Sequence, residues 1–185
     1  MTIPTLENQR VMLSPLKLEQ AETLLSIASQ HNLVQYSPSN IAALPDLKNY
    51  IKIALKQNIE ASCIPFIIYD KSVGKYAGST RFMNIDSYNK VLHIGSTWIG
   101  QEFHGTGLNA EMKKLMLNYA FDDLKFEKVE FRVDERNVKS RKAIEKLGAV
   151  LEGILRKNVY LLDGFKRNTC CYGILKEEYI MDKKS

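Results

Sequence analysis

The chain has 185 residues, of which 45% are hydrophobic and 25% are charged, as in ordinary soluble globular proteins. This length predicts a single domain over residues 1–185. No apolar run approaches the roughly 20 residues of a membrane-spanning helix, and the first residues lack the pattern of a signal peptide, so we expect a cytoplasmic protein with no membrane partner. The net charge of +5 permits anionic ligands. The basic residues are scattered, however, so nucleic acid is not expected as the main partner.

The cysteines predict neither a disulfide framework nor a metal site, because there are three of them and they are unsuitably spaced. Cys170 and Cys171 are neighbours in an expected strand, where consecutive side chains point to opposite faces. Together with Cys63 they are interpreted as small buried residues. We therefore expect no bound metal.

In the first half of the chain, hydrophobic spacing predicts a strand, two helices and a meander. Residues 10–16 form the strand, which Pro15 ends. Apolar residues at helical spacing predict helices over 18–30 and 46–60, and Asp46 is placed to cap the second helix. The period then changes to that of an antiparallel meander, with strands at 64–70, 76–83 and 91–99.

Helices and strands alternate after the meander. A helix is predicted to start near Leu108, and an alternating pattern predicts a half-buried strand over 128–134. A further helix is predicted over 137–149, with Asn137 as its N-cap and Gly148 just past its end. The tail predicts two strands joined by an Asp-Gly turn.

The stretch "WIGQEFHGTGLNAEM", residues 98–112, places Gly105 and Gly107 in a polar turn directly before a helix. Glycines let the backbone approach a ligand closely, and a helix N-terminus favours phosphate. The letters "GTGLNA" also match the dinucleotide fingerprint of NAD-binding oxidoreductases. That alternative is disfavoured for three reasons. The preceding strand belongs to an antiparallel meander, four residues separate it from the turn, and about 50 residues follow Asp134, too few for a second nucleotide-binding half.

Several motifs together resemble those of the GNAT acyltransferases. "FHGTGLNAE" resembles the pyrophosphate-binding loop of that family, and "NVKSRKAIEKLGA" resembles its later helical motif. "RVMLSPL", "WIG" and "LEGILR" occur in the order typical of the RimJ/RimL-like N-acetyltransferases. The resemblance covers nearly the whole chain. It implies a GNAT fold of the α+β class, with a mixed, mostly antiparallel central sheet that is flanked by helices and splayed at the acetyl-CoA site.

The resemblance also implies acetyl-CoA as the acetyl donor and an amine as the acceptor, in a monomer or a homodimer. The pyrophosphate would meet backbone N–H groups of the glycine turn, and the pantetheine would pair with the edge of the preceding strand. The 3′-phosphate on the adenosine of acetyl-CoA would meet Lys146 or, as an alternative, Arg141. The residues implied in cofactor binding are Trp98, Ile99, His104, Gly105, Thr106, Gly107, Leu108, Asn137, Ser140 and Lys146.

Three side chains are candidates for catalysis by the same resemblance. His93 lies on the strand before the turn, where relatives frequently carry Glu, and is the candidate base for the amine. Ser140 lies one helical turn beyond Asn137 and could protonate the leaving thiolate. Tyr160 is an alternative proton donor. Each has an ordinary structural interpretation as well: a packed histidine, an exposed helix serine and a packed tyrosine.

Two departures from the family pattern bear on function. Glu102 occupies a position that is usually Gln or Arg, so phosphate binding has to rest on backbone N–H groups. Residues 157–160, "KNVY", lack the Glu that some ribosomal-protein-modifying relatives carry there. The acceptor therefore stays open among a protein N-terminus, a polyamine, an aminoglycoside and an amino acid. A catalytically silent CoA-binding module is the alternative to an enzyme.

Overall fold

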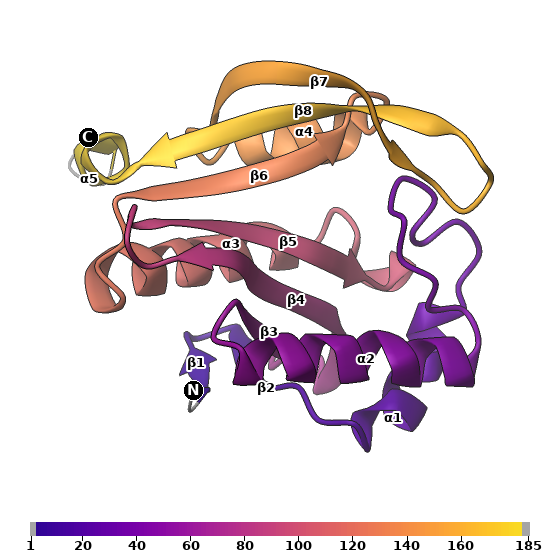
Figure 1. Cartoon of the computed structure of the whole chain (residues 1–185). Coiled ribbons are helices and arrows are strands. Elements are labelled where there is room, and N and C mark those ends of the chain that lie inside the picture. The colour runs from indigo at the N-terminus through magenta and orange to yellow at the C-terminus, as the bar shows by residue number, and fades with distance from the viewer. Residues whose placement is uncertain (1–2, 183–185) are drawn as a thin grey trace.

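A computed structural model describes residues 3–182 and shows one eight-stranded sheet with helices on both faces (Figure 1). The strands are β1 Leu6–Glu7, β2 Val11–Pro15, β3 Cys63–Asp70, β4 Lys75–Asp86, β5 Val91–Ile99, β6 Lys128–Asp134, β7 Val150–Tyr160 and β8 Lys166–Leu175. Their order across the sheet is β1-β2-β3-β4-β5-β6-β8-β7. Neighbouring strands are antiparallel, except that β5 and β6 are parallel. The predicted α+β architecture with a mixed, mostly antiparallel sheet is confirmed.

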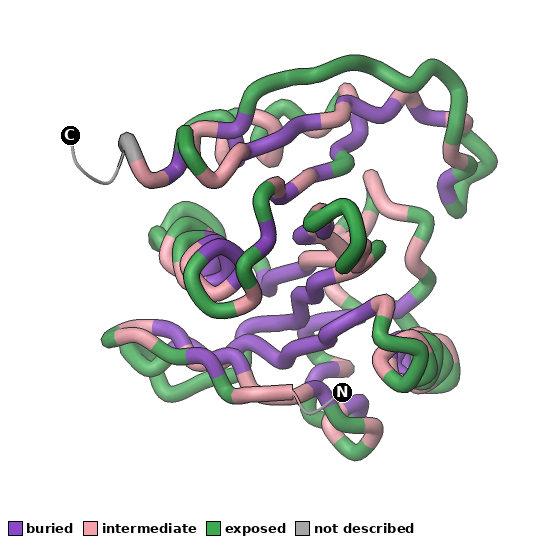
Figure 2. Tube along the Cα trace, turned by 60° about the vertical axis from the view of Figure 1, so that its left-hand side comes forward, coloured by how far each residue is buried: buried purple, intermediate pink, exposed green. Residues whose placement is uncertain are grey.

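Two hydrophobic cores lie on opposite faces of this sheet. The helices are α1 Gln20–Ala28, α2 Leu44–Ile59, α3 Leu108–Asn118, α4 Val138–Glu145 and α5 Lys176–Asp182. One core is formed with α1 and α2, and the other with α3 and α4. Strand β3 lies between them, because Ile67 belongs to the first core whereas Phe66 and Ile68 belong to the second. Figure 2 shows the resulting band of buried residues through the central strands.

Local sequence signals predicted the N-cap of α4 correctly and the N-cap of α2 incorrectly. Asn137 caps α4 as predicted, since its Oδ1 accepts a hydrogen bond from the Ser140 N–H at 3.1 Å. The prediction that Asp46 caps α2 is wrong. The helix begins at Leu44, with Pro45 in its first turn, a position that suits proline because the N–H there has no helical partner. Asp46 lies inside the first turn, where a negative charge is favourable.

The central feature of the sheet is an opening between β5 and β6. Their ladder has three pairs and ends at His93 and Glu130. Beyond this point β5 runs on to Ile99 and β6 to Asp134, and no ladder pairs join them among the described residues. Figure 1 shows the two strands diverging toward the right-hand side. The sheet is therefore splayed between the two strands where the sequence predicted it.

A β-bulge, which the sequence did not reveal, shapes the opened part of β5. The pairs Arg81–Gly95 and Ser79–Trp98 enclose one residue on β4 but two on β5. Ser96, one of these two, has a φ of 47°. Such a bulge bends a strand and redirects its side chains. Here it lies within the part of β5 that has left β6.

The chain ends in the predicted hairpin of β7 and β8. Gly164, with a φ of 81°, lies in the turn between them. Cys170 is buried and Cys171 is half-buried on the opposite face of β8, and all three cysteines carry free thiols. Within residues 3–182, no helix is both long and apolar enough to cross a membrane.

Candidate active site

The glycine turn connects β5 to α3 at the open end of the sheet. Gly105 and Gly107 have φ angles of 75° and 88°, a left-handed conformation that favours glycine. Gly107 is the N-cap position of α3 and offers no side-chain cap, and the Leu108 N–H donates to Thr106 Oγ1 at 3.4 Å. A Cβ added to Gly105 would meet no atom within 4 Å. The turn therefore presents backbone to open space beside a helix N-terminus, an arrangement suited to a phosphate group.

Arg10 holds this turn from the other side. Its Nη1 donates to the Thr106 carbonyl at 2.5 Å and its Nη2 donates to Thr106 Oγ1 at 3.0 Å. The same Nη2 forms an ion pair with Asp70 Oδ2 at 3.1 Å. Burial acts to raise the pKa of Asp70, but hydrogen bonds from Ser72 and Arg10 outweigh it and keep the pKa below its usual value. The sequence had placed Arg10 in a family-like opening motif without assigning it a role.

The remaining turn residues have structural partners. A ring nitrogen of His104 lies 2.9 Å from the Ile99 carbonyl, in agreement with a structural interpretation. Glu102 forms an exposed ion pair with Lys75 at 3.3 Å. Leu108 is fully buried at the start of α3.

The Trp98 side chain packs in a hydrophobic core. It is 4% exposed, and its Nε1 donates to the Tyr50 hydroxyl at 3.3 Å. Tyr50 in turn donates to the carbonyl of Ser96, in the bulge, at 3.2 Å. Helix α2 thereby supports β5 where β5 leaves β6. Because Trp98 and Ile99 lie beyond the last ladder pair, the backbone edge of β5 that faces β6 has no ladder partner there among the described residues.

Helix α4 begins on the other side of the opening. The Asn137 side-chain oxygen is engaged in capping through the Ser140 N–H, while no partner for its Nδ2 is found among residues 3–182. Arg141 donates to the Tyr172 hydroxyl at 2.9 Å and to the Glu135 carbonyl at 3.2 Å, so it is held against the protein. Lys146 is exposed at the far end of α4, about 13 Å along the helix axis from Asn137.

His93 lies at the vertex of the opening. Its Nε2 is 3.1 Å from Glu130 Oε2 and its Nδ1 is 3.2 Å from Asn84 Nδ2. Burial lowers the pKa of His93; Glu130 acts to raise it, and Arg132 lowers it further, so the net shift is downward. The imidazole is therefore neutral at pH 7. These partners favour the tautomer that donates from Nε2 to Glu130 and accepts at Nδ1 from Asn84.

Tyr160 is not brought close to His93. It is 65% exposed and pairs with Lys166 at the start of β8. Glu130, the ladder partner of His93, pairs with Gly173. Lys166 and Gly173 are seven residues apart on β8, which corresponds to roughly 23 Å along a strand.

A pocket of about 620 Å³ lies between the segment 28–37 and the β7–β8 turn. Arg136, which directly precedes Asn137, lines this pocket together with Leu162 and Asp163. The Arg136 guanidinium stacks on the Phe165 ring at 3.8 Å and forms an ion pair with Asp134 at 2.8 Å. The pocket thus borders the α4 side of the opening.

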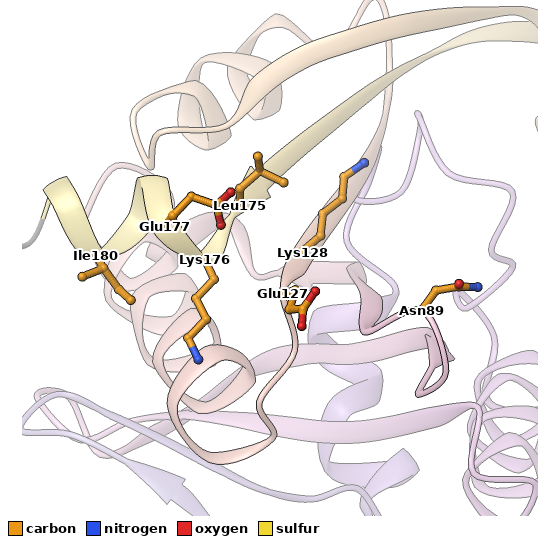
Figure 3. A pocket seen from close by; sticks show the side chains of 7 residues that line it. All are labelled: Asn89, Glu127, Lys128, Leu175, Lys176, Glu177 and Ile180. Atoms are coloured by element: carbon orange, nitrogen blue, oxygen red, sulfur yellow. The ribbon is translucent and has the colours of Figure 1, made fainter.

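A second pocket, of about 400 Å³, lies at the opposite end of β6 (Figure 3). Lys128 lines it and pairs with Val91, at the end of the β5–β6 ladder farthest from the glycine turn. It therefore belongs to a different part of the surface. Among the described residues, no group of three His, Cys, Asp or Glu side chains could hold a metal ion.

A sheet opened between two parallel strands, with a glycine turn and a helix N-terminus at the open end, defines an acyltransferase that uses an acyl-CoA donor. Residues 10–150 match the family model described as "Acetyltransferase (GNAT) domain". The chain belongs to this family, as the sequence motifs had predicted, and is an acetyl-CoA-dependent acyltransferase by its family.

Two curated relatives illustrate the similarity. The chain is 31% identical over 117 residues to "Putative ribosomal N-acetyltransferase YdaF" of Bacillus subtilis (strain 168), an alignment that covers 63% of this chain and 61% of that protein. It is 26% identical over 178 residues to "Uncharacterized N-acetyltransferase p20" of Bacillus licheniformis, which covers 95% of this chain and 98% of that protein.

Solved structures agree on the fold. A GCN5-related N-acetyltransferase from Brucella melitensis superposes with a TM-score of 0.87 at 27% identity, covering 100% of this chain and 84% of that chain. Spermidine N-acetyltransferase from Vibrio cholerae, in complex with CoA and spermine, gives a TM-score of 0.77 at 19% identity, covering 94% and 99% of the two chains.

Proposed function

We propose that this protein transfers the acetyl group of acetyl-CoA to a primary amine by direct attack in a ternary complex. The observation that carries this proposal is the opening between β5 and β6 beside the glycine turn at the N-terminus of α3. An acyl-CoA arm needs such an opening, because its amides can pair with strand edges that have lost their ladder partner. We also propose that residues 1–185 act as one domain in the cytoplasm, as a monomer or a homodimer.

The cofactor is proposed to bind through backbone more than through side chains. Within the stretch from His104 to Leu108, the N–H groups of Gly105 and Gly107 have no partner among the described residues and would hold the pyrophosphate, with Gly105 providing the close approach. The edge of β5 at Trp98 and Ile99 would pair with the pantetheine. Asn137 would add its side-chain amide.

Two solvent-accessible positions complete the proposed cofactor site. Lys146 would approach the 3′-phosphate only as a flexible side chain on the surface of α4. Ser140, which is half-buried one turn into the same helix, would supply a proton to the departing thiolate. Tyr160 is the weaker candidate for that step, because it lies far from the vertex at His93.

The acceptor amine has to be neutral to attack a thioester, so a base or a water chain is required. His93 is neutral near pH 7 and lies at the vertex of the opening. Its Nδ1 lone pair is engaged with Asn84 Nδ2, so it would take a proton only after exchanging this partner or through an intervening water. We propose this exchange as part of acceptor binding.

The pocket between segment 28–37 and the hairpin turn is the proposed entrance for the acceptor. It borders the opening at Arg136 and is separate from the glycine turn. The similar proteins bear names that point to two acceptor classes, a ribosomal protein and a polyamine. Both offer a primary amino group, and we propose a peptide or small-molecule amine without choosing between them.

Two observations favour a silent CoA-binding module as the second candidate. Both ring nitrogens of His93 are occupied, and the Glu expected there from the family is absent. An NAD-binding oxidoreductase is disfavoured by the fold, since β5 and β6 form the single parallel pair among the described strands.

The decisive experiment measures thiol release from acetyl-CoA with a panel of peptide α-amines, lysine, polyamines and aminoglycosides, followed by mass mapping of the product. Acetylation of an amine nitrogen supports the enzyme. Tight CoA binding without turnover on any amine identifies the module, and thermal stabilisation by NAD but not by acetyl-CoA would overturn both.

A further inference from the structure

A buried lysine lies beneath the opening and has no role in the proposed function so far. Lys113 on α3 is 5% exposed. Its Nζ donates to Thr97 Oγ1 on β5 at 2.8 Å and lies 5.9 Å from the centre of the Phe131 ring on β6. The amine therefore bonds to β5 and lies near β6 from the α3 side.

Both contacts fall where the two strands have separated. The last ladder pair joins His93 to Glu130. Thr97 lies four residues beyond this pair, in the bulge of β5, and Phe131 directly follows it on β6. Lys113 Nζ thus lies on the floor of the opening, close to whatever occupies it.

Among the described residues, no charged side chain compensates this amine, since burial is the only cause of its lowered pKa. Nζ contacts Thr97 on β5 and lies near Phe131 on β6, and Thr97 Oγ1 is in turn 2.8 Å from Thr80 Oγ1 on β4. All three are uncharged. Burial lowers the pKa of Lys113 to about 7.

The hydrogen-bonding capacity of the lysine is also unfilled. An ammonium group has three donors, and among residues 3–182 the hydrogen-bond acceptor found for Nζ is Thr97 Oγ1. A buried donor without a partner costs free energy. A ligand in the opening that offers an acceptor oxygen would remove this cost.

We propose that Lys113 is a cofactor-binding residue, whose Nζ donates a hydrogen bond to a carbonyl oxygen of the acyl-CoA arm in the opening. This inference rests on the proposed acetyl-CoA site. Amide and thioester carbonyls of the arm are acceptors of the required kind. The pyrophosphate is proposed to bind at the glycine turn and the 3′-phosphate near Lys146, so Lys113 would contribute to binding of the arm alone.

The test compares Lys113→Met with Lys114→Met. Met preserves most of the length of the lysine stem and removes the donor. Lys114 is the adjacent lysine, with its side chain 58% exposed and paired with Glu111, so it controls for the loss of one positive charge from the same helix. Dissociation constants are measured by calorimetry for CoA and for adenosine 3′,5′-bisphosphate, which lacks the arm.

We expect Lys113→Met to weaken CoA binding about 10-fold, as for the loss of one hydrogen bond from a charged donor, and to leave bisphosphate binding unchanged. Lys114→Met should bind both ligands like the wild type. The advantage of the wild type over Lys113→Met should shrink as the pH rises from 6 to 9, because a charged donor binds a carbonyl more strongly than a neutral one.

Two results would overturn the inference: equal CoA affinity in wild type and Lys113→Met, or an equal loss for CoA and the bisphosphate, which would indicate general damage to the site. Absence of CoA binding by the wild type would instead refute the proposed function. Circular dichroism of both variants verifies that they are folded before binding is measured.

Discussion

Asn137 combines a structural contact with a proposed binding contact, and the two can be separated. Serine is as good an N-cap as asparagine, whereas alanine at this position costs about 1 kcal/mol of stability. We therefore predict that Asn137→Ser keeps the unfolding free energy of the wild type while Asn137→Ala lowers it. Both variants lack the amide Nδ2, and both should bind acetyl-CoA more weakly. If Asn137→Ser binds acetyl-CoA with wild-type affinity, Asn137 acts as a helix cap and does not bind the cofactor.

His93 gives a prediction that also reports on the acceptor. If it accepts the amine proton, His93→Ala should lower kcat about 10²-fold or more with little change in cofactor affinity. The pKa of His93 lies below its usual value, so the base is present at pH 7 and is lost as the pH falls through that pKa. Both rates should decline on the acid side, because the amine becomes protonated, and the wild type should show a further decline below the pKa of His93 that His93→Ala lacks.

The size of the His93 effect depends on the amine. An α-amine has an ordinary pKa of about 7.7–8.0 and a lysine amine about 10.4, so a base matters less for an α-amine at neutral pH. A small, pH-independent effect with every acceptor would contradict the catalytic role and leave His93 as a packed residue.

At the scale of elements, the glycine turn yields a test with a matched control. Gly105 and Gly74 both have a positive φ, at 75° and 68°, and a Cβ at either position would meet no atom closer than 3.7 Å. Asparagine tolerates this conformation, so both Gly105→Asn and Gly74→Asn should fold. We predict that Gly105→Asn loses acetyl-CoA affinity by about 10-fold or more, because its side chain fills the space proposed for phosphate.

Gly74→Asn, in the β3–β4 turn, should bind acetyl-CoA like the wild type. Comparable affinity in Gly105→Asn would refute the phosphate role of the turn. Gly107 is a poorer choice for this test, since a Cβ there would lie 3.3 Å from Arg10 Nη1 and would disturb the contact that holds the turn.

Elements with a strong local pattern could be predicted from the sequence, and elements set by tertiary contacts could not. The strand at 128–134 alternates cleanly, and the structure has β6 over the same residues. Short β1 and the π-helical turn Tyr119–Asp123 have no periodic signal of useful length. The bulge at Ser96 likewise has no recognisable sequence pattern, because it is defined by the register of β5 with β4.

At the scale of the whole molecule, the glycine turn and the opening were predictable because motifs in a fixed order implied them. The residues that support the site were not, since their partners are distant in sequence. Arg10 holds Thr106 from 96 positions away. Lys113 belongs to a "KK" pair, which the sequence would place on an exposed helix surface. Packing of α3 against the sheet nevertheless buries Lys113 beside Thr97.

The burial of Lys113 predicts a pH dependence of the stability of the whole protein. In the unfolded chain this lysine titrates near 10.5, and in the folded protein near 7. Between these values the unfolded state binds more protons, so the free energy of unfolding should rise with pH across this window. Below pH 7 both states are protonated and the folded state bears the full cost of burying the charge.

Lys113→Met lacks this titrating amine. Subtracting its free energy of unfolding from that of the wild type cancels the pH dependence that all other groups contribute. We predict that the wild type gains stability relative to Lys113→Met when urea unfolding is compared at pH 7 and at pH 9.5, whereas Lys114→Met follows the wild type at both. Parallel curves for wild type and Lys113→Met would show that the amine keeps an ordinary pKa. In that case Lys113 would reach solvent in the folded protein, and its place on the floor of the opening would have to be abandoned.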